Sequence, residues 1–599
     1  MELIMKNKYA KWVTCGFLGL MAVLCLDSCT DDHYDLNSNN AKGTLWENLS
    51  ATGECNDFLN ILSKAVVNKK AYGVPASITY ADLLKADNSM TAWAPKDGTY
   101  DAQKWLDLLA EAKQADESGD LTTAADKYKV VEKQFVKNHL SYFNYNGSYG
   151  TSSRIALANG KYATYNSAMG TIKDIAIESG ASGTIPCVNG TAHVLTSYIP
   201  YSYDLKEILE ATPDLSLMND YVASKDTLIF LESQSIKGAT VDGQVQYVDS
   251  VFSESNKLMP DIASNADSLV AAIYFKNDAW QKALEYTKKS YCYKTAYSYI
   301  DEKGDVYTDS LRADSLQEAK AVSALFKNMF YSLNEQPAFP KSLANAETVK
   351  SFFETTDSLA SVDYYGTYDQ YQRAPYANTL TDGQTPVEVS NGYVFMVDNF
   401  NFKANKSWQF DKTIEAEGGN QVNTQYSKSL STASPRGVSY TVLESACNPA
   451  VSGKLSDDSY QEFVPSSSAA NPQVTFDLKS VLSGTYDIYA VIVPENISDT
   501  TNVSPKANKF TATLTYDFDD QGKQLTVAST LGDNGTFTND VTKIDTIKLF
   551  DNYKFDVCYY EISKCNPMLT ITSSIKLKDR KSCTPNLRID CILLVGKDE

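Results

Sequence analysis

The sequence predicts a multidomain α+β protein, in which two domains of mixed helices and strands precede an all-β sandwich of the jelly-roll type. Two observations lead to this prediction. Short segments recur in the same order within residues 42–402, and from about residue 408 the pattern changes to alternating apolar and polar residues. With 599 residues, 43% of them hydrophobic, the chain can form several separate cores.

Four pairs of matching segments define the repeat. They are LWENLSAT (45–52) with LKEILEAT (205–212), WAPKDGTY (93–100) with IYFKNDAW (273–280), FVKNHLSYF (135–143) with LFKNMFYSL (325–333), and NGTAHVLT (189–196) with NGYVFMVD (391–398). The spacing between copies widens along the chain, so we expect insertions in the second copy.

Each match also predicts local structure. TAWAP (91–95) is a short apolar strand ended by Pro95, and the polar residues after it lead into a helix around Trp105. Asn189-Gly190 is a turn signal before a strand that closes at Pro200. One helix with an apolar face is predicted from residues at helical spacing, namely Leu45, Leu49, Phe58, Leu59 and Leu62.

This order of segments resembles the fasciclin-like domain. That family opens with a helical segment, has a buried strand that ends FAPTNDAF, and closes with an NG-x-x-H-x-hydrophobic strand, which residues 189–195 fit. The resemblance covers residues 42–202 and, more loosely, 203–402, where Phe275 replaces the proline and Phe395 the histidine. It implies two α+β domains that act in adhesion or ligand display rather than in catalysis.

His139 and His193 are residue types that bind metals or transfer protons. The second copy has Met329 and Phe395 at the matching positions, and these side chains do neither. We therefore expect both histidines to be hydrogen-bonded core residues.

Residues 1–28 have the pattern of a secretory signal peptide, because a basic start precedes an apolar run too short to span a membrane. The run ends in Leu-Asp-Ser-Cys, which resembles a bacterial lipobox and implies that Cys29 is the lipid-attachment site and the mature N-terminus. Asp27 departs from the small neutral residue of that motif, and Cys25 is an alternative anchor. A metal site at Cys29 and His33 has no further ligands nearby.

Residues 29–41 then form an acidic tether. Thr30-Asp31-Asp32 resembles the tag that sends some lipoproteins to the outer face of the outer membrane; the alternative is a simple solvated spacer. The formal net charge of −20 and the pI of about 4.7 argue against binding to nucleic acid or docking on anionic lipid. No second run of 18 or more apolar residues appears in the sequence, so we expect the N-terminal lipid to be the only membrane attachment.

The cysteines that follow the signal peptide and Cys29 are too widely spaced for a dense disulfide framework, and none forms a CxxC pair. Their connectivity stays open, and those near the C-terminus are the best candidates for pairing: Cys558, Cys565, Cys583 and Cys591.

Residues 408–599 are predicted to form the β-sandwich from strands near 474–478, 486–493 and 510–516, separated by Gly- and Asn-containing turns. IEAE (414–417), SGTYDIYAVIV (483–493) and LRIDCI (587–592) are similar to carbohydrate-binding jelly rolls. That resemblance implies a structural calcium held by Glu415, Glu417 and Asp590; the alternative is a strand edge with solvated acids.

Sugar binding needs an exposed aromatic side chain, and every tryptophan lies at or before Trp408. The sandwich must use tyrosines, none of which the sequence distinguishes as a site: Tyr426, Tyr440, Tyr460, Tyr553, Tyr559 and Tyr560.

Nucleophile elbows, HExxH, P-loops and dinucleotide fingerprints are absent from the sequence, so we predict a protein that is not an enzyme. A carboxylate pair for glycoside hydrolysis stays open among 74 acids. The leading hypothesis is a surface lipoprotein of the outer membrane that binds glycan for a polysaccharide uptake system, in complex with its transporter. The alternatives are a cell-adhesion protein that binds a surface protein through the fasciclin-like domains, and a scaffold subunit without a ligand.

Overall fold

The structure is a computed structural model that describes residues 41–598 except 68–77, 88, 147–152, 181–182, 231, 235, 242–243, 250–251, 261–262, 264, 301–305, 311, 342–343, 357–358, 360, 362–379, 418–427, 519–523 and 563–564. The chain divides into two compact units, Met1–Ser202 and Tyr203–Glu599. The predicted signal peptide, Cys29 and nearly all of the acidic tether lie outside the described residues and stay predictions. None of the helices in the described part is long and apolar enough to cross a membrane.

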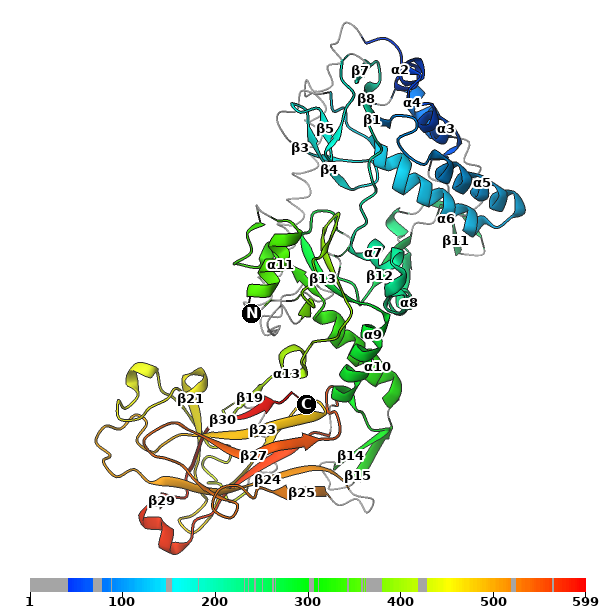
Figure 1. Ribbon diagram of the computed structural model, residues 1–599. Coiled ribbons are helices and arrows are strands. Elements are labelled where there is room, and N and C mark those ends of the chain that lie inside the picture. The colour runs from blue at the N-terminus through cyan, green and yellow to red at the C-terminus, as the bar shows by residue number, and fades with distance from the viewer. Residues whose placement is uncertain are drawn as a thin grey trace. The chain divides into compact units, whose positions relative to one another are not determined.

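The first unit is a mixed α/β structure built around the sheet β2-β1-β8-β7, in which β1 and β8 run parallel. Helices lie beside this sheet, and a small sheet β3-β4-β5-β6 has its own apolar cluster (Figure 1). Its elements are α2 (Leu45–Thr52), α3 (Asn56–Lys64), α4 (Tyr80–Lys85), β1 (Met90–Pro95), α5 (Ala102–Ser118), α6 (Leu121–Val131), β2 (Leu140–Ser141), β3 (Ser153–Ala156), β4 (Tyr162–Asn166), β5 (Thr171–Ile172), β6 (Ile175–Ala176), β7 (Thr184–Cys187) and β8 (Gly190–Leu195).

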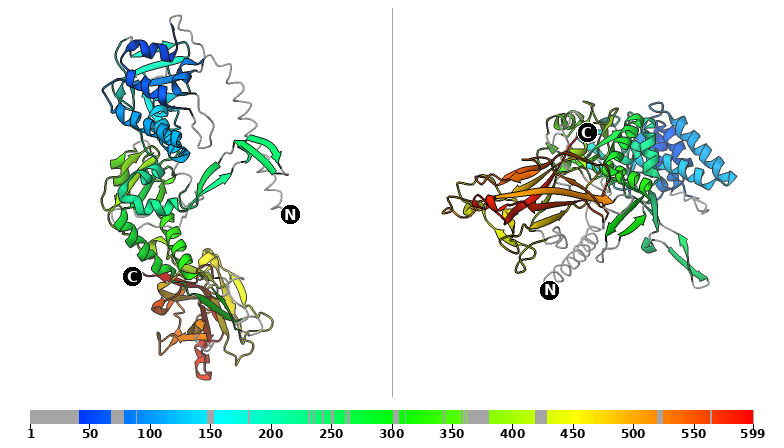
Figure 2. Two further views of the ribbon diagram at one scale, coloured as in Figure 1. Left: turned by 90° about the vertical axis from the view of Figure 1, so that its right-hand side faces the viewer. Right: turned by 90° about the horizontal axis from the view of Figure 1, so that it is seen from below.

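The second unit begins with a sheet of the same order, β16-β13-β18-β17. The elements are α7 (Leu205–Ala211), α8 (Ser216–Ala223), β9 (Asp226–Phe230), β10 (Ile236–Val241), β11 (Gln244–Asp249), β12 (Phe252–Asn256), β13 (Val270–Phe275), α9 (Asn277–Lys288), β14 (Ala296–Ile300), β15 (Val306–Ser310), α10 (Ala313–Lys327), β16 (Phe330–Ser332), α11 (Ala346–Thr355), β17 (Val387–Val389), β18 (Gly392–Val397) and α13 (Ala404–Ser407). The insertions expected here are the strands β9–β12 and the hairpin β14–β15. Figure 2 shows the β9–β12 segment projecting from the body of its unit.

The two sheets correspond residue by residue. Met90 pairs with Gly190 in one, and Val270 with Gly392 in the other, each at the start of a parallel β-pair. In this register Phe395 corresponds to His193. Met329, the residue before β16, corresponds to His139, the residue before β2. The internal repeat in the sequence therefore corresponds to a repeated sheet.

The C-terminal region is β-rich, and its described strands form two six-stranded sheets that pack face to face (Figure 1). One has the order β20-β21-β30-β23-β27 with β19 beside β30, and the other β22-β28-β24-β25 with β26 and β29 beside β24. The strands are β19 (Lys412–Glu415), β20 (Val438–Thr441), β21 (Ser459–Phe463), β22 (Gln473–Asp477), β23 (Gly484–Ile492), β24 (Ala507–Phe518), β25 (Gln524–Ala528), β26 (Thr536–Thr538), β27 (Asp545–Phe555), β28 (Met568–Ser573), β29 (Cys583–Thr584) and β30 (Leu587–Gly596). Apolar residues that alternate along these strands point into the shared core, as in Phe476, Ile488 and Leu514.

The sandwich and the preceding part of the second unit share a packed boundary. Leu482 and Cys558 of the sandwich belong to the apolar core of the β13 sheet region. The Cys558 amide donates to the Cys292 carbonyl at 2.8 Å, and the Tyr297 hydroxyl donates to the Cys558 carbonyl at 2.6 Å. Separating residues 203–402 from the sandwich would therefore expose core side chains of both parts.

Two local predictions are wrong. The single helix expected across Leu45 and Leu62 is two helices, α2 and α3, because Gly53 ends α2 in the left-handed conformation, with φ at 65°. The strand expected to close at Pro200 ends at Leu195.

Candidate functional site

The predicted calcium ligands meet where β30 changes its neighbour. The first residues of β30 pair with β21, and the later ones pair with β19. Asp590 lies at this change, between the residue that pairs with Gln461 and the residue that pairs with Glu415. Glu417 follows two residues after the end of β19, so the carboxylates of Glu415, Glu417 and Asp590 come together from both ends of the domain.

A turn between β20 and β21 closes the cluster. Asp457 and Asp458 both adopt the left-handed conformation, with φ of 48° and 53°. The Ser456 hydroxyl donates to Glu415 at 2.6 Å and its amide to Asp590 at 3.1 Å, while the Ser459 hydroxyl donates to Glu417. Sequence reasoning missed both serines, although the unusual Ser-Asp-Asp-Ser run was a local signal for such a turn.

One oxygen on each carboxylate remains unused. Glu415 Oε2, Glu417 Oε2 and Asp590 Oδ1 are buried and make no hydrogen bond within the described residues. Asp590 is only 1% exposed, and burial together with neighbouring carboxylates raises its pKa to about 7. Burial also raises the pKa of Glu415. Buried carboxylates without a counter-charge are costly, so the cluster is suited to a bound cation.

The donor set favours calcium over zinc. Calcium takes oxygen ligands in flexible geometry, and three unpaired carboxylate oxygens supply part of such a shell. Ligand atoms of Glu415, Asp590 and Cys591 lie within 4.8 Å of one another. Burial raises the pKa of the Cys591 thiol, which keeps it protonated, whereas zinc requires a thiolate.

An aromatic and charged surface lies on the same sheet, on the face opposite the sandwich core. Tyr440 on β20 is 40% exposed and stacks on Tyr460 of β21, with ring centroids 5.3 Å apart and planes at 18°. Next to this pair, Arg588 forms an ion pair with Glu462 at 2.6 Å, and Nη1 of Arg588 is buried without a hydrogen-bond partner in the described part. We call Tyr440, Tyr460, Glu462 and Arg588 the tyrosine face.

The other tyrosines considered from the sequence are in different positions. Tyr559 is 3% exposed and belongs to the core, and Tyr553 packs against Phe555 with ring centroids at 5.0 Å. Tyr560 lies at the boundary with the β13 sheet region, beside Tyr291, and Tyr426 lies outside the described residues.

Both described histidines are buried in the first unit. His139 Nε2 accepts from the Ile199 amide at 2.8 Å and its Nδ1 donates to the Phe135 carbonyl at 2.8 Å. His193 stacks on Trp93, with ring centroids 4.5 Å apart. Burial lowers the pKa of each to about 4, so both are neutral at pH 7.

The eight cysteines of the described part are free thiols, including the four considered for pairing. Burial raises the pKa of Cys55 to about 12 and that of Cys558 to about 11. Neither is therefore a reactive thiolate at neutral pH.

No family model matches the chain, and no curated protein matches it. Among solved structures, it is similar to the CBM22-1–GH10 modules of a Clostridium thermocellum endo-1,4-beta-D-xylanase complexed with xylohexaose, at 14% identity and a TM-score of 0.18, covering 31% of this chain and 29% of that one. A Paenibacillus xanthan lyase matches at 14% identity and a TM-score of 0.17, over 35% of this chain and 16% of that one. A carbohydrate-binding module specific for non-crystalline cellulose, CBM28, matches at 14% identity and a TM-score of 0.11. The match covers 23% of this chain and 71% of that module. The chain thus spans less than a third of the xylanase modules, and TM-scores this low do not establish a common fold.

Proposed function

We propose that this protein is a non-catalytic glycan-binding protein whose binding surface is the tyrosine face. The observation that carries the proposal is the exposed ring of Tyr440, held flat against Tyr460. A tyrosine fixed by stacking offers a rigid apolar platform for a sugar ring at little cost in side-chain entropy.

Charged groups beside the platform supply hydrogen bonds. Arg588 is held between Glu462 and Glu495, at 2.6 and 3.8 Å, and the Tyr440 hydroxyl lies 3.5 Å from Glu462. Sugar hydroxyls donate as well as accept, so the Glu462 carboxylate, held in place by Arg588, suits them as an acceptor. Because the ion pair is almost buried, its geometry is fixed before a ligand arrives.

A calcium ion at Glu415, Glu417 and Asp590 would support this surface. The cluster joins β19 and β30 to the turn that leads into β21, the strand that carries Tyr460 and Glu462. The ion would then have a structural role and would not contact the glycan.

The wider assignment is part of the same proposal. A lipid on Cys29 would hold the chain at the outer membrane, where it would capture polysaccharide for an uptake system. The two sheets with corresponding registers support two fasciclin-like domains before the sandwich. The neutral, buried histidines support a role without acid–base catalysis.

Titration calorimetry of the chain from Thr30 onward against plant and host polysaccharides tests the proposal. We expect Tyr440→Ala to weaken binding by about tenfold or more, the loss of about 1–3 kcal/mol of aromatic contact. Tyr142→Ala, at a tyrosine of the first unit that is 54% exposed, is the matched control. Absence of binding to any polysaccharide by the folded protein would contradict the proposal.

A second variant separates glycan binding from adhesion. Deleting residues 41–202 removes the first unit without opening the boundary between the β13 sheet region and the sandwich. Glycan binding should survive this deletion. Loss of binding by the deleted but folded chain would place the active surface in the first unit instead.

A further inference from the structure

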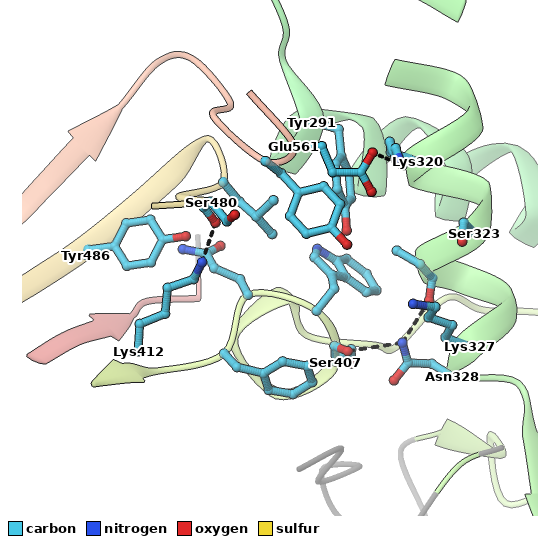
Figure 3. A pocket seen from close by; sticks show the side chains of 16 residues that line it. Tyr291, Lys320, Ser323, Lys327, Asn328, Ser407, Lys412, Ser480, Tyr486 and Glu561 are labelled. Carbon is cyan, nitrogen blue, oxygen red and sulfur yellow. Dashed lines mark hydrogen bonds and ion pairs between the residues drawn. The ribbon is translucent and has the colours of Figure 1, made fainter. Parts of the chain in front are cut away.

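A recess in the second unit is lined by residues other than those of the tyrosine face. This cavity, of about 320 Å³ and partly open to solvent, lies between α10, the segment after α13, the loop before β23 and the segment after β27 (Figure 3). This volume falls at the lower end of the ~300–1,000 Å³ typical of small-molecule sites, enough for roughly one or two sugar rings.

Positive charge dominates the lining. Lys320 and Lys327 come from α10 and Lys412 from the start of β19, whereas Glu561 is the one acidic residue among the described residues that line the cavity. Glu561 already forms an ion pair with Lys320. The recess therefore carries excess positive charge in a chain whose net charge is −20.

Lys412 is the most constrained of the three lysines. Its ammonium donates to the Lys479 carbonyl at 3.1 Å and to the Ser480 carbonyl, and no carboxylate pairs with it in the described part of the chain. An ammonium has three donors, so one remains for a ligand. Burial lowers its pKa to about 8, which leaves most of the population charged at pH 7.

Unpaired hydroxyls also line the cavity. The Ser407 hydroxyl is buried without a hydrogen-bond partner in the described residues. The Tyr486 hydroxyl is also buried; the Leu482 backbone and the Gln409 side chain lie beside it, but neither meets it with hydrogen-bond geometry. Leaving buried hydroxyls unpaired costs free energy, which a ligand with its own hydroxyls recovers.

Aromatic rings complete the recess. Trp408 is held by a hydrogen bond of 3.0 Å from its indole nitrogen to the Ser290 hydroxyl, and Tyr291 packs edge-on against Tyr560 at 6.3 Å between centroids. Apolar rings combined with a few fixed polar groups are the usual lining of a site for a small polar ligand.

We propose that this cavity binds a saccharide that carries a carboxylate, such as a uronic acid residue. The ammonium of Lys412 faces the carboxylate, the hydroxyls of Ser407 and Tyr486 pair with ring hydroxyls, and Trp408 contacts the apolar face of the sugar. The site needs α10 as well as the sandwich, so residues 408–599 alone lack half of it. It is separate from the tyrosine face and does not depend on glycan binding there.

Titration calorimetry with digalacturonic acid and its dimethyl ester tests this inference, because the ester keeps the rings and removes the charge. We expect the chain from Thr30 onward to bind the acid about tenfold more tightly than the ester. Lys412→Met, which keeps the apolar stem, should reduce binding of the acid to the level of the ester. Lys282→Gln, at an exposed lysine of α9 outside the cavity, should change nothing.

If Lys412→Met does not fold, Lys327→Gln, at an exposed position on α10, serves as the test variant instead. We expect its affinity for the acid to fall about threefold. Equal affinity for acid and ester, absence of binding to the folded protein, or full binding by the folded lysine variants would each overturn the inference. Tyr440→Ala should leave binding of the acid unchanged, and a loss there would assign the acid to the tyrosine face instead. The Tyr440 and Lys412 variants thus test the tyrosine face and the cavity independently of each other.

Discussion

Asn189 and Asn391 make the same set of hydrogen bonds in two different sheets. Asn189 Oδ1 accepts from the amide of Leu45, the first residue of α2, at 2.7 Å, and Asn391 Oδ1 accepts from the amide of Leu205, the first residue of α7, at 3.1 Å. The amide nitrogen of each donates to carbonyls of the segment before the central strand. Each asparagine thus ties the opening helix to the turn before the parallel strand.

Asn189→Ala should destabilise the first unit by about 2–4 kcal/mol, because it leaves a buried amide and buried carbonyls unpaired. Asn60→Ala, at an exposed position of α3, is the matched control and should be close to neutral. Urea denaturation followed by tryptophan fluorescence measures both. Equal stability of the two variants would contradict the role assigned to Asn189.

The glycines after these asparagines allow the parallel strands to approach. A Cβ on Gly190 would lie 1.8 Å from the Met90 carbonyl oxygen, and one on Gly392 would lie 1.8 Å from the Val270 carbonyl oxygen. Gly190→Ala should therefore cost more than about 3 kcal/mol, since the clash is with backbone.

Gly119→Ala separates this clash from the cost of backbone conformation alone. Gly119 has φ of 84° and open space around it, so alanine there should cost only about 1 kcal/mol. The difference between the two variants in free energy of unfolding, measured by thermal unfolding, gives the cost of the steric clash alone. A Gly190→Ala protein as stable as Gly119→Ala would show that β1 and β8 can move apart.

The first unit should lose stability in mild acid. The folded-state pKa of His139 and of His193 is about 4, below the ordinary value of 6.5, so the unfolded state binds more protons between these values. Stability therefore falls as pH falls from about 6.5 toward 4, by about 1–2 kcal/mol per histidine at pH 5. NMR titration of labelled histidine gives the pKa values directly, and a pKa near 6.5 for either residue would refute the assignment.

Calcium should stabilise the second unit. At a concentration a hundred times the dissociation constant the gain is about 2.7 kcal/mol, and EDTA should reverse it. Magnesium should be a poorer substitute because it demands a tighter octahedral shell. Differential scanning calorimetry with each ion measures the effect.

Asp590→Asn provides the control for the calcium test. The variant should not respond to calcium. In EDTA it should be at least as stable as the unaltered protein, because it removes one of several repelling buried carboxylates. If calcium still stabilises Asp590→Asn, the calcium site does not include Asp590 and lies elsewhere in the protein.

The sequence alone identified features with a short-range origin. Asn189-Gly190, repeated at 391–392, predicted a turn that leads into a strand, and β8 and β18 begin there. Alternation near residues 474–478 and 486–493 located β22 and β23, since side chains alternate between the two faces of a strand.

The sites depended on tertiary structure to different degrees. The resemblance to carbohydrate-binding jelly rolls predicted Glu415, Glu417 and Asp590 as calcium ligands. Only the structure shows that Ser456 and Ser459 hydrogen-bond to them and that one oxygen of each carboxylate is buried without a hydrogen bond in the described residues. Tyr440 became distinct from the other tyrosines only through its pairing with Tyr460 across β20 and β21. Nothing in the sequence distinguished Lys412, because its environment comes from α10, the segment after α13 and the turn before β23. Strand pairing and cavity walls join residues distant in the chain, and no local pattern encodes which distant residues will meet.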